Sequence, residues 1–207
     1  LNAQVTNTGT LDIDSSLTIS KASATHTSSG TIDIAGGATL TYTGTGTTLV
    51  NQSGGVVLGT GTLSVSGIAS FTNDGAINAG TAGTVGTLAI TGAVLQGATG
   101  SLGVDIASGT SFDVLNVNGA YAIAGALNIN VVGAFDPTAG QTFTVLNYGA
   151  REGGTFTITD NRADLGFTAT YNTTNLVLTA SIVDQTLTGT TGPDTLTGGI
   201  GNDTISG

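Results

Sequence analysis

The sequence predicts an all-β protein built as a parallel β-helix, a β-solenoid of stacked coils. Three observations support this prediction. Apolar and polar residues alternate with period two in many short segments, helical patterns are almost absent, and turn-forming Asn, Ser and Gly recur at similar spacings. Period-two alternation is typical of half-buried strands, and an internal repeat of about 20–50 residues is typical of solenoids.

The alternation is clearest in residues 10–14, 30–34 and 62–66. In each segment Leu, Ile or Val occupies one set of alternate positions, and Thr, Ser or Asp occupies the other. Successive side chains of a strand point to opposite faces. We therefore expect the apolar face of each strand to point into the solenoid and the polar face to be solvated.

The repeat begins with Asn or Ser near a glycine, followed by a strand. Its glycines are Gly9, Gly30, Gly54 and Gly75, separated by 21, 24 and 21 residues. A second predicted strand follows in most copies, at 17–19, 40–42, 63–65 and 88–90. One coil cannot bury its apolar face alone, so we expect these coils to stack.

The composition changes near residue 98. Every Phe except Phe71, and every Tyr except Tyr42, lies beyond this point. A solenoid ends in unpaired strand edges and an apolar cross-section, and an aromatic-rich segment could cover them. We therefore predict solenoid coils in 1–97, terminal coils and a capping segment in 98–184, and a separate C-terminal region in 185–207.

Residues 60–180 resemble the C-terminal part of passenger domains in bacterial autotransporter adhesins. The resemblance rests on segments 86–88, 113–119, 125–129 and 140–146. It implies that the solenoid is a right-handed parallel β-helix with a surface-adhesive role.

Two nonapeptides, 189–197 and 198–206, form the main chemical motif. The second fits Gly-Gly-x-Gly-x-Asp-x-apolar-x throughout, and the first has Thr190 in place of the second Gly. Glycines let turn carbonyls point at one centre, and Asp supplies a hard anionic oxygen. The pattern resembles the calcium-binding repeats of RTX proteins, which implies bound Ca²⁺ and the start of an RTX β-roll. The candidate metal-site residues are Gly189, Thr191, Asp194, Gly198, Ile200 and Asp203.

In such a roll each calcium lies between turns on the same side, eighteen residues apart, and each repeat ends in a short strand. Leu196 and Ile205 are then the inward apolar residues of two strands. Asp194 and Asp203 are nine residues apart and belong to opposite sides. We therefore expect two half-sites, weak calcium binding, and further repeats beyond Gly207 in the natural protein. The alternative is that both motifs are ordinary Gly-Asp turns.

Charge and composition limit the partners. The net charge is −10, with 13 acidic residues against Lys21, Arg151 and Arg162. So few cations argue against nucleic acid and anionic membranes as partners. No apolar run is long enough to predict membrane insertion. Residues 1–10 lack the pattern of a signal peptide, so we expect an export signal that was removed or lies elsewhere.

Candidate catalytic groups are few. Asp12 and Asp14 share a strand face, and Asp33 could lie one coil above them, but a solvated polar row is the simpler interpretation. His26 has no second His or Cys with which to bind zinc. Glu152 is adjacent to Arg151, which suggests a surface ion pair. We predict no catalytic centre, with a β-helix polysaccharide-modifying enzyme as the less favoured alternative.

Two structural functions remain open. The chain could be a stalk in a bacterial surface adhesin or biofilm-matrix protein exported by type I secretion. It could instead self-assemble into an extracellular filament or surface layer. Ice binding by the Thr-rich run 41–48 is less favoured, because glycines interrupt the run. The sequence names no receptor or glycan ligand.

Overall fold

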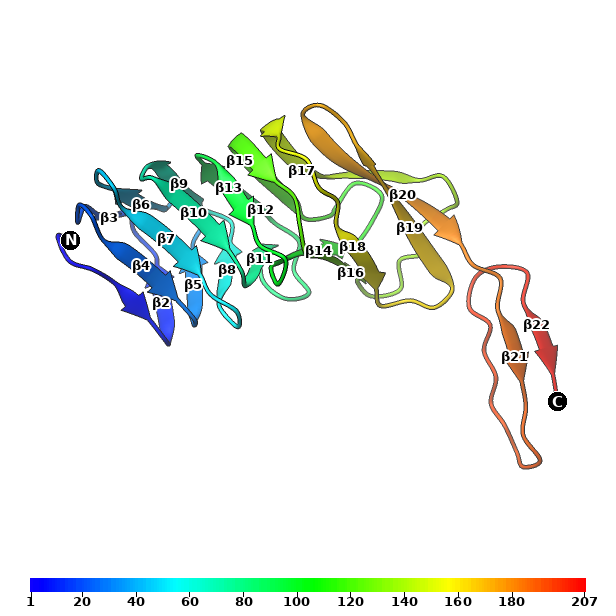
Figure 1. Ribbon diagram of the computed structural model, residues 1–207. Helices are drawn as coiled ribbons and strands as arrows, with labels where there is room; N and C mark the ends of the chain where they lie inside the picture. The colour runs from blue at the N-terminus through cyan, green and yellow to red at the C-terminus, as the bar shows by residue number, and fades with distance from the viewer.

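The computed structural model describes residues 1–207 and contains strands but no helix. Stacked strands make up most of the molecule, and a separate two-stranded tail carries the C-terminus (Figure 1). The predicted all-β parallel solenoid is therefore confirmed. No helix suitable for crossing a membrane is found.

The solenoid consists of three parallel ladders. The first contains β1 (Thr6–Asn7), β4 (Thr25–Ser28), β7 (Thr48–Asn51), β10 (Ser70–Asn73), β13 (Val94–Gln96) and the end of β15 (Val114–Ala122). The second contains β2 (Thr10–Ile13), β5 (Thr31–Ile34), β8 (Val56–Gly59), β11 (Ala76–Ala79), β14 (Ser101–Ile106), β16 (Ala126–Val131) and β18 (Thr157–Asp160). The third contains β3 (Leu17–Ile19), β6 (Thr39–Thr43), β9 (Thr62–Gly67), β12 (Thr87–Thr91), the start of β15 and part of β17 (Thr142–Arg151). Because β15 pairs with both β12 and β13, it joins the first and third ladders into one sheet.

Apolar side chains stack in register inside the second and third ladders. The stack in the second ladder is Leu11, Ile32, Val57, Ile77, Leu102, Leu127 and Ile158. The stack in the third is Leu17, Leu40, Leu63, Ile90, Val117 and Tyr148. One cluster of 34 buried residues runs from Ile13 to Ala180, so coils and terminal strands share a single core.

The register corrects two details of the predicted repeat. Gly55, rather than Gly54, stacks on Gly30, because Thr31 pairs with Val56. Gly54 lies in the turn before it with φ of +86°, and a Cβ there would meet no atom within 4 Å. In the third ladder Leu63 pairs with Ile90 rather than with Leu88.

A polar ladder, buried from Ser28 to Gln96, lies inside the first ladder, where sequence analysis expected turn residues. Its members in register are Asn7, Ser28, Asn51, Asn73 and Gln96. Asn51 Nδ2 donates to Asn73 Oδ1 at 2.7 Å, and Asn73 Nδ2 donates to Gln96 Oε1 at 2.9 Å. The same amides also donate to backbone carbonyls near the following turns. The ladder therefore ties successive coils together through their interior.

The aromatic-rich end contains an antiparallel unit, which we call the cap: β17, β19 (Leu165–Tyr171) and β20 (Asn175–Ile182). β17 pairs in parallel with β15 and antiparallel with β20, so the strand direction changes there. Phe143 of β17 is fully buried, with the rings of Phe112, Phe135 and Phe167 around it.

Candidate calcium-binding site

The C-terminal tail is one coil of a two-stranded roll. β21 (Thr186–Thr188) pairs in parallel with β22 (Thr204–Ser206), and Thr186 lies opposite Thr204 (Figure 1). Backbone hydrogen bonds close the coil at 2.8 Å from Thr204 N to Gln185 O and at 2.6 Å from Gly189 N to Ser206 O. The offset between the strands is eighteen residues, which is two nonapeptides.

The six candidate metal-site residues divide between two turns. Gly189, Thr191 and Asp194 lie in turn 189–194, and Gly198, Ile200 and Asp203 lie in turn 198–203. No group of three or more His, Cys, Asp or Glu side chains converges on a possible metal position. The two turns therefore follow one another along the chain, and each carries one of the two Asp carboxylates.

The carboxylates of the two motifs have different partners. Asp194 accepts hydrogen bonds only within its own turn, from Thr190 N at 2.7 Å and Thr190 Oγ1 at 3.0 Å. Asp203 Oδ1 accepts from Gln185 N at 2.7 Å, eighteen residues earlier. Only turn 198–203 therefore contacts a turn stacked beside it, which is residues 180–185.

The predicted strands of the nonapeptides are only partly correct. Residues 204–206 form β22, but residues 195–197 form no strand. Eighteen residues before 195–197 lies β20, which already pairs with β17 and β19, so this segment has no strand to pair with. Leu196 is partly buried, and Ile205 is 55% exposed rather than inward.

Residues 180–185 occupy the place of a turn in a degenerate repeat that sequence analysis missed. The segment has no glycine, Gln185 takes the place of the Asp, and residues 180–182 belong to β20, paired with β19. Asp184 Oδ1 accepts a hydrogen bond from Asn202 N at 2.9 Å. The sequence does indicate this repeat, because residues 186–188 and residues 195–197, nine positions further on, are both Thr-Leu-Thr.

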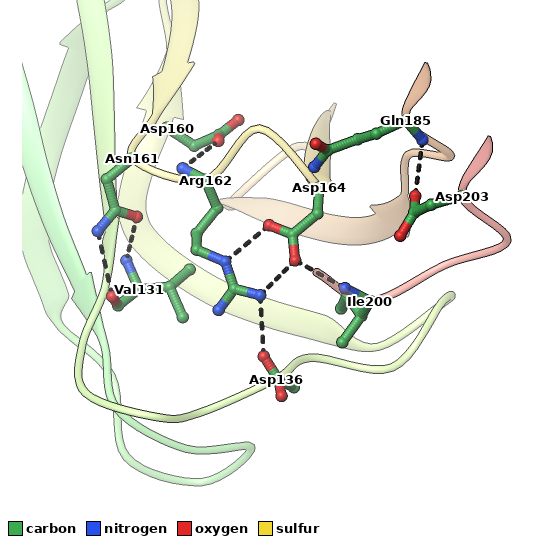
Figure 2. A network of polar contacts seen from close by, with 9 residues as sticks. All are labelled: Val131, Asp136, Asp160, Asn161, Arg162, Asp164, Gln185, Ile200 and Asp203. Atoms are coloured by element: carbon green, nitrogen blue, oxygen red, sulfur yellow. Dashed lines mark hydrogen bonds and ion pairs between the residues drawn. The ribbon is translucent and has the colours of Figure 1, made fainter. Parts of the chain in front are cut away.

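A second missed residue, Asp164, joins the cap to turn 198–203 (Figure 2). Its Oδ2 accepts a hydrogen bond from Ile200 N at 3.0 Å. Arg162 donates from Nε to Asp164 Oδ1 at 2.7 Å and from Nη2 to Asp136 Oδ1 at 2.9 Å. The Asp164 side chain is 6% exposed. The hydrogen bonds from Arg162 hold the pKa of Asp164 well below its ordinary value.

The other singled-out polar residues lie far from the tail. Asp33 pairs in register with Asp12, and burial, followed by the charges of Asp12 and Asp14, raises the pKa of Asp33. His26 is buried, accepts a hydrogen bond at Nδ1 from Val5 N at 3.1 Å, and has its pKa lowered by burial.

The predicted ion pair between Arg151 and Glu152 is wrong. The Arg151 guanidinium lies 4.5 Å from the centroid of the Tyr171 ring and donates to Gly154 O. Both ion pairs in the protein involve Arg162 instead.

Two further carboxylates border a hollow of about 300 Å³ on the second ladder. Asp105 accepts hydrogen bonds from Gly83 N at 2.7 Å and Asn130 Nδ2 at 2.7 Å. Asp113 accepts from Gly86 N at 2.7 Å and Asp105 N at 2.9 Å. These contacts fasten the backbone around residues 83–86 to the neighbouring coil.

Asp113 provides a pH-dependence prediction. Burial raises its pKa from 3.8 to about 7, so folding favours the protonated form. The free energy of unfolding should therefore lose a contribution as the pH rises from about 4 to about 7. Over this range, the free energy of unfolding of Asp113→Asn, measured in urea, should depend less on pH than that of the original protein. Glu152→Gln, the control at an exposed position, should keep the pH dependence of the original protein. An equal slope in Asp113→Asn would contradict the prediction.

Comparison with known families supports the site. The family described as RTX calcium-binding nonapeptide repeat (4 copies) matches residues 182–207. No curated protein matches the chain. The tail thus carries RTX nonapeptide repeats, which bind calcium, and the match includes part of the degenerate turn.

Proposed function

We propose that this chain is a non-catalytic stalk segment of a secreted bacterial adhesin or biofilm-matrix protein. The observation that carries the proposal is the direct passage from the cap into RTX repeats. β20 is the last strand of the cap, and only residues 183–185 separate it from β21. A long stacked solenoid and a calcium-binding roll thus follow one another without a linker domain.

The calcium chemistry favours a role outside the cell. Calcium is bound by hard oxygen ligands, carboxylates and carbonyls, and weak extracellular sites suit millimolar calcium. We assign Asp194 and Asp203 as carboxylate ligands, with backbone oxygens of Gly189, Thr191, Gly198 and Ile200 beside them. Metal binding and folding are coupled when no complete site exists beforehand, so calcium met outside the cell would stabilise these turns.

The positions of the two arginines also argue against nucleic acid as a partner. Arg162 is paired with Asp136 and Asp164, and Arg151 lies against Tyr171. The net charge of −10 is therefore not relieved by a basic patch on these residues. A neutral glycan or a protein on a cell surface is a more suitable ligand.

Electron microscopy of the purified chain with and without millimolar calcium tests this role. We expect isolated rods in both conditions, and attachment of these rods to bacterial cells only when millimolar calcium is present. A double variant with Asp194→Asn and Asp203→Asn should still form rods, but its attachment to cells should no longer depend on calcium. Ordered fibres or sheets would favour a filament or surface layer, and cleavage or epimerisation of a glycan would overturn the non-catalytic assignment.

A further inference from the structure

We infer that the cap holds the first coil of the RTX roll in place without calcium, and that Asp164 is the positioning residue. This inference deepens the proposed function and depends on it only for the calcium-binding role of turn 189–194. It concerns the coil from 180–185 to 198–203, which is fastened by carboxylates that accept hydrogen bonds from backbone N–H groups.

The hydrogen bond between the cap and turn 198–203 has an ionised, nearly buried acceptor. Asp164 lies between β18 and β19, and its Oδ2 accepts the backbone N–H of Ile200. A hydrogen bond to an ionised acceptor is stronger than one between neutral groups. Arg162 donates to both Asp164 oxygens, at 2.7 and 2.5 Å, and so stabilises the charged form in a nearly buried position.

Two more carboxylates link segment 180–185 to turn 198–203. Asp184 accepts from Asn202 N, and Asp203 accepts from Gln185 N (Figure 2 shows the second contact). The Oδ1 atom of Asp203, which accepts this N–H group, is less available to a cation, so Oδ2 is the oxygen left to bind calcium. The donors come from both turns, so the contacts join the turns in both directions.

The degenerate turn also lacks what a calcium site needs. Ala180, Ser181 and Ile182 lie in β20, opposite residues of β19. An extended strand in a sheet does not curl its carbonyls around a cation, and no glycine is present to change that. The first coil is therefore joined by hydrogen bonds where a regular pair of RTX turns would share a metal ion.

Turn 189–194 forms the contrast. Asp194 contacts only Thr190 of its own turn, and the turn makes no carboxylate contact with the cap. The first coil thus supplies an ordered strand, β22, beside the start of turn 189–194. In a solenoid the ordering of one unit is favoured by an ordered neighbour, so calcium would bind to a tail that is already partly ordered.

Hydrogen exchange in a calcium-free buffer with chelator tests the inference on the full chain. The amides of Ile200, Asn202 and Gln185 should exchange at least about tenfold more slowly than unprotected amides. Asp164→Ala removes the acceptor from the cap. Gly199→Ala disturbs the contact from the roll side, because its Cβ would clash with Asp164 Oδ2 and because Gly199 has a φ of +77°, at which alanine is strained. Both variants should lose most of the protection at Ile200 and Asn202.

Gly192→Ala is the control for an added methyl group in the tail, because its Cβ would meet no atom closer than 3.9 Å, and Asp164→Ala is the test that adds no backbone strain to the tail. It should leave the protection at Ile200 and Asn202 unchanged. Amides of β19 and β20 report on the cap itself and should remain protected in Gly199→Ala, which separates loss of docking from unfolding. Unprotected Ile200 and Asn202 in the original chain, or full protection in both Asp164→Ala and Gly199→Ala, would overturn the inference. Because no calcium is present, failure of the adhesive role would not affect the result.

Discussion

Replacing Phe143 with alanine is expected to lower the free energy of unfolding by about 3–5 kcal/mol. Phe143 is fully buried in β17, the strand where parallel pairing changes to antiparallel pairing. The Phe112 ring packs edge-on against it with centroids 5.4 Å apart, and Phe135 lies at 6.4 Å. Truncation would leave a cavity at the junction of coils and cap. Urea unfolding measures the change.

Thr144→Ala is the matched control for this substitution. Thr144 is the next residue of β17 and is only partly buried on the opposite face. It should change the free energy of unfolding by no more than about 0.5 kcal/mol. A loss below about 1 kcal/mol in Phe143→Ala would contradict the assignment of this aromatic cluster to the common core.

The second large effect is expected from Asn73→Ala, at about 2–4 kcal/mol. Asn73 is fully buried, accepts from Asn51, and donates to Gln96 and to Gly75 O. Its removal leaves a cavity and deprives buried polar groups of partners. Urea unfolding again provides the measurement.

Asn73→Leu separates the two contributions. Leucine restores the volume but cannot donate or accept a hydrogen bond, so most of the loss should remain. Thr72→Ala, at the neighbouring partly exposed position, should be nearly neutral. Full recovery of stability in Asn73→Leu would show that packing alone, and not the amide ladder, stabilises this row.

The strands could be predicted because the alternation of apolar and polar residues within a single strand is enough to identify its buried face. The register between coils was not, since it depends on turn lengths. Gly54 and Gly55 are neighbours in a glycine pair, and only the pairing of Thr31 with Val56 distinguishes them. The amide ladder was missed for a related reason, because Asn and Ser beside Gly are also ordinary turn formers.

In the candidate site, too, the local features could be predicted from the sequence and the long-range contacts could not. The nonapeptides identify calcium-binding turns from local sequence alone. The hydrogen bond between Asp164 and Ile200 spans 36 residues and exists only because the cap folds back beside the tail. The Arg151–Glu152 pair was a wrong prediction for the same reason, because the Tyr171 ring that Arg151 contacts is brought there only by the folding of the cap.

The stacking of the ladders has a mechanical consequence. Hydrogen bonds between parallel coils run along the solenoid axis, so a tensile load applied to the two ends opens them one coil at a time instead of shearing them together. Adjacent coils are offset by 21 residues between Thr10 and Thr31 and by 25 between Thr31 and Val56. Each released coil would lengthen the chain by about 70–90 Å. The solenoid would then act as an extensible tether that dissipates load in steps.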